Sequence, residues 1–318
     1  MKNATGNKSR ISRAKWKLPS RELVAKTNGP LSDLLKSEEW VSSTARLPLA
    51  LGQEPNGRWV IPDLTQFRHM LIAGFRPFIA DGIHAILGGL LSARTPDDMR
   101  LILMDTAKTG LSRYGKLPHL LAPVLKTPKQ ANLALLWAIC EFGRRTEMLR
   151  QAGVPDIGAF NEASKNPILN KIRKHPPGGL PRIIIVADDM WLHKGGADAF
   201  RKKCAALAAC AHRTGIHLIA MTTNPGESLT DGLQSSLRGR VAFSLLNAGD
   251  SQLVIGRSGA EKLERMNEML IGLKARRFVR AQCAHVVPTE IGKIVRFWEN
   301  QGKPDFLPEF RRKARWIQ

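Results

Sequence analysis

The stretch LIAGFRPFIADGIHAIL, residues 71–87, joins an apolar segment that reaches Gly74 to an apolar run of helical period. A strand that passes through a glycine into a helix is where a nucleotide-binding protein keeps its phosphate loop, of the form G-x-x-x-x-G-K-[ST]. Gly74 matches the first glycine of that pattern, but Ile79, Ala80 and Asp81 stand where the second glycine, the lysine and the hydroxyl belong. The segment therefore predicts the strand and helix of such a site without its phosphate-binding residues.

The residues of this segment are poorly suited to holding phosphate. Glycines let successive backbone N–H groups face one anion, whereas Pro77 has no N–H and bulky neighbours resist the required backbone conformations. Arg76 is the candidate substitute for the missing lysine, because residues 37–107 contain no lysine at all. Asp81 would repel a phosphate about 4 Å away by roughly 4 kcal/mol at an effective dielectric of about 20. We therefore do not expect normal ATP hydrolysis by this chain.

Further apolar runs follow along the chain and set the fold class. They lie at 70–74, 100–105, 183–188, 216–222 and 240–245, and helical segments separate them. Continuous apolar runs are typical of strands buried on both faces, and strands that alternate with helices form a parallel, doubly wound α/β sheet with helices on both faces. Residues 46–64 resemble a hairpin with its turn at Pro55-Asn56-Gly57, residues 129–153 form the clearest helix, and Ser32 is a plausible N-cap of a short helix.

The charge of the chain indicates an anionic partner. Its 318 residues hold 49 Lys and Arg against 27 Asp and Glu, which gives a net charge of +22. Nucleic acid is the first candidate and an anionic membrane surface the second, with a basic but unattached enzyme as the alternative. The four cysteines form no C-x-x-C pair or zinc pattern, and the sequence contains neither a secretory h-region nor a run of about 18 apolar residues. We expect a cytoplasmic protein with no bound metal and no membrane partner.

The segment RIIIVADD, residues 182–189, is an apolar strand that ends in two carboxylates. In a nucleotide-hydrolysing motor, the first such carboxylate helps to hold Mg²⁺ and a second one beside it polarises the attacking water. Asp188 and Asp189 are therefore the candidate catalytic carboxylates. The alternative is that they mark only the edge of the sheet, where polar loops begin.

Many segments, read in order, make a more specific pattern than any single motif. They include HMLIAG, LILMDTAKTGLSRYGKLPHLL, LLWAICEFGRRTEMLRQAGV, IIIVADD, RVAFSL, GAEKLERMNEML and VRFWENQGKPDF. In order and spacing, the chain resembles the motor core of the FtsK/SpoIIIE family of double-stranded-DNA translocases over residues 30–306. The resemblance implies a RecA-like P-loop NTPase fold, a hexameric ring around DNA and ATP hydrolysis between subunits.

The resemblance also assigns roles to individual positions. Asp188-Asp189 takes the place of the family's Asp-Glu, and Thr223 takes the place of a glutamine that senses the γ-phosphate. Arg240 matches an arginine that faces a neighbouring subunit's nucleotide, the alternative being an arginine paired on its own surface. ATP and Mg²⁺ are the cofactors implied if the site still functions. The scaffold segments match, whereas the phosphate-binding positions do not.

We divide the chain into a basic, flexible N-terminal tail (1–29), an FtsK-like RecA-fold core (30–306) and a basic C-terminal tail (307–318). Double-stranded DNA is the expected partner, bound through phosphates and without sequence preference. The candidate DNA-binding residues are Lys8, Arg10, Arg13, Lys15, Lys17, Lys171, Arg173, Lys174, Arg276, Arg277, Arg311, Arg312 and Lys313.

Three hypotheses follow from these patterns. The first is a DNA-binding pseudo-ATPase, alone or as a passive subunit beside an active FtsK-like partner, in DNA translocation, segregation or transfer. The second is an active ATP-dependent translocase with an atypical nucleotide site. The third is a non-enzymatic decoy or structural subunit in another motor's ring. The first two require DNA binding, and only the second requires ATP hydrolysis by this chain.

Overall fold

The computed structural model describes residues 16–18, 30–165, 179–188, 197–229, 231–264, 266–274 and 277–311. Within these ranges, the strands form one nine-stranded sheet in the order β2-β1-β9-β8-β7-β3-β6-β5-β4. The strands are Gly52–Gln53 (β1), Trp59–Val60 (β2), Met70–Ala73 (β3), Met99–Leu103 (β4), Arg182–Ala187 (β5), Ile216–Thr222 (β6), Gly239–Ala242 (β7), Glu268–Lys274 (β8) and Arg277–Cys283 (β9).

Five central strands are parallel to one another, namely β7, β3, β6, β5 and β4. Each contains a run of buried aliphatic side chains, as expected for strands that are covered on both faces. The chain passes from β3 outward to β4, returns through β5 and β6, and then crosses to the other side of β3 to form β7. The carboxyl end of β3 is therefore the point where the direction of strand addition reverses, and ligands of open α/β sheets bind at such points.

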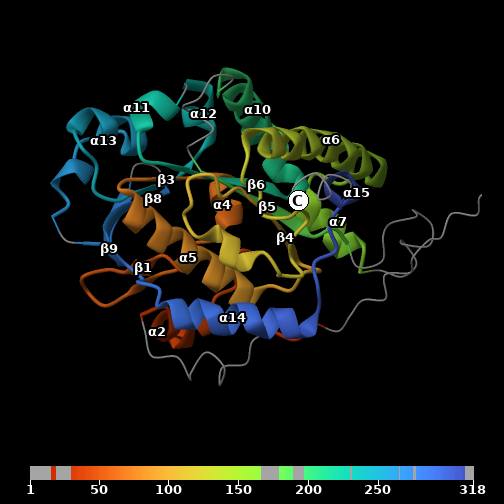
Figure 1. Ribbon diagram of the computed structural model, residues 1–318, viewed down its shortest axis with the longest axis horizontal. Helices are drawn as coiled ribbons and strands as arrows, with labels where there is room; N and C mark the ends of the chain where they lie inside the picture. Colours follow the sequence, from red (N-terminus) through yellow and green to blue (C-terminus); the bar gives the residue numbers. More distant parts are fainter. Residues whose placement is uncertain are drawn as a thin grey trace, which may run out of the picture.

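Helices cover both faces of the sheet (Figure 1). The helices are α2 (Pro30–Lys36), α3 (Glu38–Val41), α4 (Leu64–Phe67), α5 (Arg76–Ala93), α6 (Pro128–Ala152), α7 (Ile157–Ala163), α10 (Ala197–Cys210), α11 (Pro225–Ser228), α12 (Asp231–Ser236), α13 (Ala248–Ile255), α14 (Pro288–Gln301) and α15 (Pro308–Arg311). Helices α5, α14 and α2 lie on one face, and α6, α10 and α12 lie on the other (Figure 1). Among the described helices, none is long and apolar enough to cross a membrane.

The side chains of β3 show how the two faces share the core. Met70 and Ile72 belong to the cluster that includes residues of α5 and α14, and Leu71 and Ala73 belong to the cluster that includes residues of α6 and α10. This alternation follows from the two-residue period of a strand. β3 is thus buried between two helical layers, and the turn that follows it is held from both sides.

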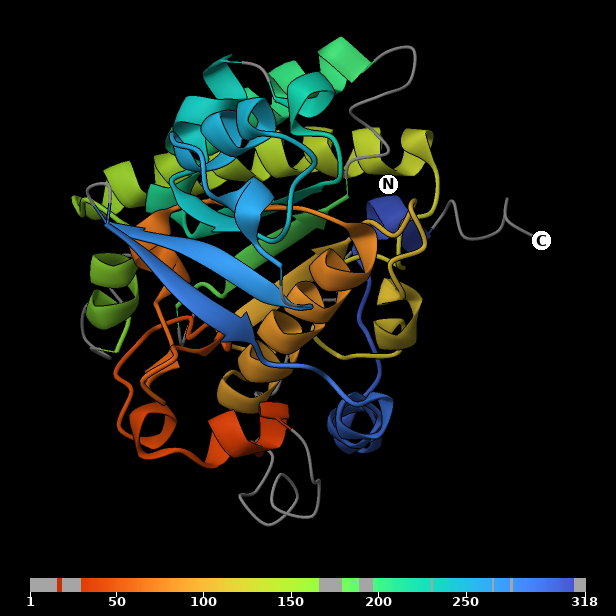
Figure 2. The same ribbon diagram turned by 90° about the vertical axis from the view of Figure 1, so that its left-hand side faces the viewer.

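An antiparallel extension enlarges the sheet beyond β7. β8 pairs antiparallel with both β7 and β9, and β1 joins β9 through Gly52 and Cys283. The pair β8–β9 is drawn in blue in Figure 2, beside the orange segments that contain β1 and β2. The hairpin of β1 and β2 was expected from the sequence, but the pair β8–β9 was not.

The parallel strands occupy the five predicted apolar runs, and α6 ends at Ala152 with Gly153 as its C-cap, as predicted. The predicted N-cap was wrong, because α2 begins at Pro30 and Ser32 lies inside the helix. Proline is favoured in the first turn of a helix, where its missing N–H costs nothing. Beyond residue 306, α15 continues the packed chain, with Phe310 buried against the sheet's second core cluster.

Candidate nucleotide site

The carboxyl edge of the parallel strands carries the residues that the sequence singled out. Gly74 follows β3, Asp188 follows β5 and Thr223 follows β6. Parallel pairing places these strand ends beside one another, with Ala73 opposite both Thr222 and Ala242. The candidate positions therefore meet at one edge, at the reversal point of the sheet.

The turn between β3 and α5 is too short to be a phosphate loop. Only Gly74 and Phe75 separate the strand from the helix, which begins at Arg76 with Phe75 as its N-cap. The carbonyl oxygen of Phe75 accepts hydrogen bonds from the N–H groups of Phe78 and Ile79, both at 3.1 Å. The positions that would form the loop are thus the first turn of a helix, and these two N–H groups already have a partner.

Aromatic rings occupy the outer side of this turn. The ring centroids of Phe75 and Phe78 are 6.5 Å apart, and those of Phe78 and Phe243 are 6.3 Å apart. Gly74 has a φ of +143°, and an added Cβ atom there would lie 2.6 Å from the Cβ atom of Phe243. The tight passage of the chain past Phe243 therefore requires a glycine at position 74, a reason independent of phosphate binding.

Asp188 is bonded to the loop that follows β4. Its carboxylate accepts a hydrogen bond from the hydroxyl of Thr106 and another from the backbone N–H of Ala107. The guanidinium of Arg76 donates to the carbonyl oxygen of Ala107 at 3.3 Å. The start of α5, the loop after β4 and the end of β5 are therefore joined directly by hydrogen bonds.

A small cavity remains at this junction. It has a volume of about 10 Å³ and is lined by Arg76, Ile79, Thr109, Asp188, Met221, Thr222 and Thr223. A cavity of about 10–15 Å³ is the minimum that holds a single water molecule. This cavity is therefore too small to hold a phosphate group.

Asp105, which follows β4, organises the neighbouring loop. Its carboxylate accepts hydrogen bonds from the N–H and hydroxyl of Ser112, at 2.9 and 2.8 Å, and from the hydroxyl of Thr109 at 3.1 Å. Burial raises the pKa of Asp105, but these hydrogen bonds outweigh burial and hold the pKa below its usual value. Its contacts are those of an acidic residue that fixes a loop rather than one that meets a ligand.

The two remaining positions of the degenerate loop lie further along α5. Ala80 is a helical residue on the second turn, and the side chain of Asp81 points to the antiparallel extension of the sheet. Its carboxylate accepts a hydrogen bond from Asn267 Nδ2 at 3.0 Å and lies 3.1 Å from Nδ1 of His285. Asp81 thus links α5 to the segments flanking β8 and β9, and its negative charge is directed away from the small cavity.

Arg240 lies on β7 and is bonded within its own chain. Its guanidinium donates to the carbonyl oxygens of Leu253 and Val254, at 3.4 and 2.9 Å, and to that of Gln234. Burial lowers the pKa of Arg240 to about 10. The side chain therefore joins the ends of α12 and α13, and reaching a neighbouring subunit would require all three contacts to break.

Few of the predicted DNA-binding residues fall in the described ranges. The backbone N–H of Lys17 donates to Gln301, and Arg311 pairs with Asp305. Arg277 is the first residue of β9. The others lie outside the described residues, as does Asp189; they are Lys8, Arg10, Arg13, Lys15, Lys171, Arg173, Lys174, Arg276, Arg312 and Lys313.

The sequence did not point to Thr106 or Ala107 as partners of Asp188. The only signal was their position after the second parallel strand, at the edge where strand ends converge. No group of three or more His, Cys, Asp or Glu side chains among the described residues is arranged to hold a metal ion. The donors at this edge do not fit a Mg²⁺–nucleotide complex, since the lysine and the loop hydroxyl are absent and Asp188 is bonded to its own chain.

Solved structures of ATPase motor domains share this fold. The cytoplasmic domain of the type VII secretion ATPase EccC from Thermomonospora curvata aligns with a TM-score of 0.69 and 18% identity, covering 92% of this chain and 36% of that one. The pCW3 conjugation coupling protein TcpA, solved with ATPγS, aligns with a TM-score of 0.66 and 19% identity, covering 82% and 72%. The fold is therefore that of the P-loop ATPase motors, as predicted.

The sequence comparisons define the family. The profile of the FtsK/SpoIIIE family matches residues 30–227. The DNA translocase FtsK of Haemophilus influenzae is 32% identical over 297 residues, covering 87% of this chain and 56% of the relative. That of Pseudomonas aeruginosa is 32% identical over 302 residues, covering 87% and 36%. The chain belongs to the FtsK/SpoIIIE family, and it spans about half or less of the length of these relatives.

Proposed function

We propose that this chain is an FtsK-like subunit that binds double-stranded DNA and does not itself hydrolyse ATP. It would act as a passive member of a homo- or hetero-oligomer with FtsK-like subunits, in DNA translocation, segregation or transfer. The observation that carries the proposal is the closed edge at β3, where α5 begins two residues after the strand and a cavity of about 10 Å³ remains.

The loss of phosphate chemistry has three independent parts. The first turn of α5 replaces the loop whose N–H groups would cradle phosphates. No lysine supplies the charge at the β/γ-phosphates, and Arg76 is bonded to Ala107 instead. Asp188 accepts hydrogen bonds from Thr106 and Ala107 where a metal ligand would be needed. A nucleotide would have to displace all of these contacts and unwind the start of a helix.

The support for DNA binding is electrostatic. The net charge of +22 is spread over both ends of the chain and over internal basic clusters. Each Lys or Arg that neutralises a phosphate releases counterions, so binding should weaken steeply with salt, with a slope of about −0.9 per phosphate contact. The fold and family add the expectation of duplex DNA, because the FtsK relatives are described as DNA translocases.

Two titrations of the purified chain test the proposal together. Labelled duplex DNA is followed by fluorescence anisotropy at several salt concentrations, and labelled ATP with Mg²⁺ is followed in parallel. We expect salt-dependent, sequence-independent DNA binding, no saturable ATP binding and no ATP turnover with DNA present. ATP binding that DNA enhances, followed by turnover, would support the active translocase instead. Absence of DNA binding would leave the decoy or structural subunit.

A charge variant locates the DNA contacts. Replacing Lys8, Arg10, Arg13 and Lys15 together with glutamine should reduce the salt slope by about 3.6 if all four meet phosphates. The matched control replaces four exposed cations outside the predicted set, namely Arg58, Lys116, Lys126 and Lys129. A slope unchanged in the first variant, or equally reduced in the control, would remove the N-terminal tail from the DNA interface.

A further inference from the structure

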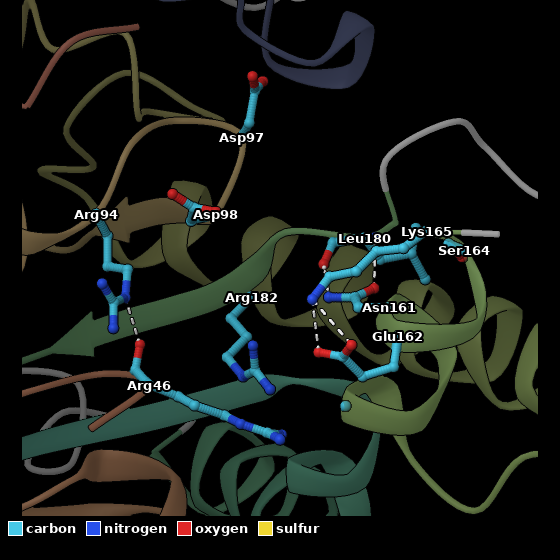
Figure 3. A pocket seen from close by; sticks show the side chains of 11 residues that line it. Arg46, Arg94, Asp97, Asp98, Asn161, Glu162, Ser164, Lys165, Leu180 and Arg182 are labelled. Carbon is cyan, nitrogen blue, oxygen red and sulfur yellow. Dashed lines mark hydrogen bonds and ion pairs between the residues drawn. The ribbon is translucent and has the colours of Figure 1, made fainter. Parts of the chain in front are cut away.

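A second cavity lies at the opposite edge of the sheet from the candidate nucleotide site. Its volume is about 570 Å³, and three arginines from separate segments line it (Figure 3). Arg182 is the first residue of β5, Arg94 is the C-cap of α5, and Arg46 lies ahead of β1. Because Arg182 is at the amino end of β5 and Asp188 follows its carboxyl end, the two cavities are separated by the length of the strand.

Arg94 has a structural role in this cavity. Its guanidinium donates hydrogen bonds to the carbonyl oxygens of Ala93 and Arg46, both at 2.6 Å, and to that of Ala45. These bonds attach the end of α5 to the segment that carries Arg46. The guanidinium of Arg94 therefore bonds to backbone carbonyl oxygens of the chain. These bonds fix the position of the segment from which the side chain of Arg46 extends.

Arg182 is a half-buried cation at the start of β5. Among the described residues, none forms a hydrogen bond or ion pair with its guanidinium, and none does so with that of Arg46. Desolvation is the largest cause that lowers the pKa of Arg182, and Arg46 is the next, while Asp63, Arg94 and Asp156 contribute smaller effects of mixed sign. The net direction is downward, which means that the surroundings of Arg182 disfavour its positive charge.

The side chain of Arg46 lies beside Arg182 rather than away from it. Figure 3 shows the two side chains next to each other, with Glu162 and Lys165 across from them. An added Cβ atom at Gly158 would lie 2.3 Å from Nη1 of Arg46, so the guanidinium rests directly over the backbone of α7. Two like charges thus lie side by side. The carboxylates of Asp63 and Asp156 partly offset the repulsion at Arg182, and Glu162 does so at Arg46, and a bound anion would offset it further.

The nearby carboxylates have hydrogen-bond or ion-pair partners other than Arg182, and Asp156 accepts a hydrogen bond from the N–H of Ala159. Asp98 accepts hydrogen bonds from the N–H and hydroxyl of Thr95, and Glu162 pairs with Lys165 at 2.8 Å. Asp63 accepts bonds from the backbone N–H groups of Arg46, Leu47 and Thr65. Burial raises the pKa of Asp63, and these bonds outweigh burial and lower it. None of these carboxylates forms an ion pair with Arg182.

We propose that Arg46 and Arg182 form a binding site for the phosphate group of a small phosphorylated molecule. A planar guanidinium fork matches phosphate oxygens, and two such forks converge here. The volume lies in the range of small-molecule pockets. The acidic groups Asp97, Asp98 and Glu162 also line the cavity; they would repel a long polyanion but leave room for a small phosphorylated ligand that lies beside the two arginines.

Isothermal titration calorimetry with pyrophosphate, and then with AMP, tests the site. We expect saturable binding by the wild-type chain, weakened at least tenfold in Arg182→Met and again in Arg46→Met. The matched control is Arg58→Met, which removes the same charge from the exposed turn between β1 and β2 and should leave affinity unchanged. Equal affinity in the wild type and both pocket variants would overturn the proposal.

Two further readouts keep the result interpretable. Without ligand, Arg182→Met should melt at the same temperature as the wild type or higher, because a half-buried cation has been removed; pyrophosphate should raise the melting temperature of the wild type only. A folded variant that has lost this ligand-induced shift supports the site.

If short duplex DNA displaces pyrophosphate competitively, the phosphate recognised belongs to the DNA backbone and the small-molecule assignment is wrong. Neither result depends on the proposed inactivity toward ATP.

Discussion

Acidification should destabilise this protein well before its carboxylates are protonated. His69, His84, His119 and His217 are buried, with at most 6% of their surface exposed. Burial lowers the pKa of His69 and His119 to about 3 and that of His84 and His217 to about 4. In the unfolded chain each histidine titrates near its usual pKa of about 6.5. Below that value the unfolded state binds more protons, so stability is present above about pH 6.5 and is lost as pH falls toward 4.

The size of the effect follows from proton linkage. Each histidine that stays neutral in the fold costs about 1.4 kcal/mol per pH unit below its unfolded pKa, which is about 2 kcal/mol between pH 7 and pH 5. All four together cost about 8 kcal/mol, a large part of the 5–15 kcal/mol typical of folded domains. For a chain of this length, with an unfolding entropy of about 2.1 cal/mol/K per residue, that loss corresponds to about 12 °C in melting temperature.

Melting temperatures measured by differential scanning fluorimetry from pH 8 to pH 5 test this prediction. His119 contacts Arg94 O at 3.0 Å and packs edge-on against Trp298, and His119→Gln should flatten the pH dependence by about a quarter. Leu120→Ala, a buried change without a titrating group, should lower the whole curve in parallel. A melting temperature that stays constant from pH 7 to pH 5, or an equal slope in His119→Gln and wild type, would refute the reasoning.

Three other substitutions probe the supports of the fold, each measured as the change in urea unfolding midpoint and slope. Gly74→Ala should cost about 2 kcal/mol or more, because its φ of +143° and the 2.6 Å approach to Phe243 leave no place for a methyl group; a loss below 0.5 kcal/mol by the same measure would contradict this account. Arg145→Met should cost about 2–3 kcal/mol, because it leaves the carbonyl oxygens of Pro181 and Thr214 without their donor, whereas Glu141 keeps its ion pair with Arg144. A loss below about 0.5 kcal/mol would show that these buried bonds do not support the fold. Glu290→Ala should cost about 2–3 kcal/mol, because the carboxylate accepts hydrogen bonds from backbone N–H groups at the start of α14 and within α2. An unchanged midpoint would mean that water replaces the carboxylate.

The parallel part of the sheet could be predicted because burial on both faces leaves a direct trace in the sequence. Strands such as β5 and β6 consist mostly of apolar residues in continuous runs, and an amphipathic helix does not have that pattern. The pair β8–β9 has no such trace. Polar residues such as Glu268, Arg280 and Gln282 interrupt it, because an antiparallel strand near the edge of a sheet is covered on fewer sides.

The candidate site was predicted by position more reliably than by conformation. The sequence placed Gly74, Asp188 and Thr223 at one edge, and the fold brings them there. The pattern G-x-x-x-x-G-K-[ST] implies a loop over residues 74–81, however, and the chain forms a helix from Arg76. Pro77, in the first turn of that helix, was the available signal, since proline is favoured there. The sequence gives no signal that Arg46 lies beside Arg182, because the two residues are 136 positions apart.

The contact between α2 and α14 has a consequence for synthesis. Ser32 donates its backbone N–H to Glu290, a residue 258 positions later in the chain. A ribosome that adds about 5–20 residues per second needs roughly 13–50 s to cover that distance. During this interval, the core cluster that includes Leu31 and Leu34 lacks the side chains that α14 contributes to it, among them Ile291 and Trp298. Nascent chains of this protein should therefore depend on chaperones that shield early-emerging segments, and truncated chains that end before α14 should be captured by such chaperones or degraded.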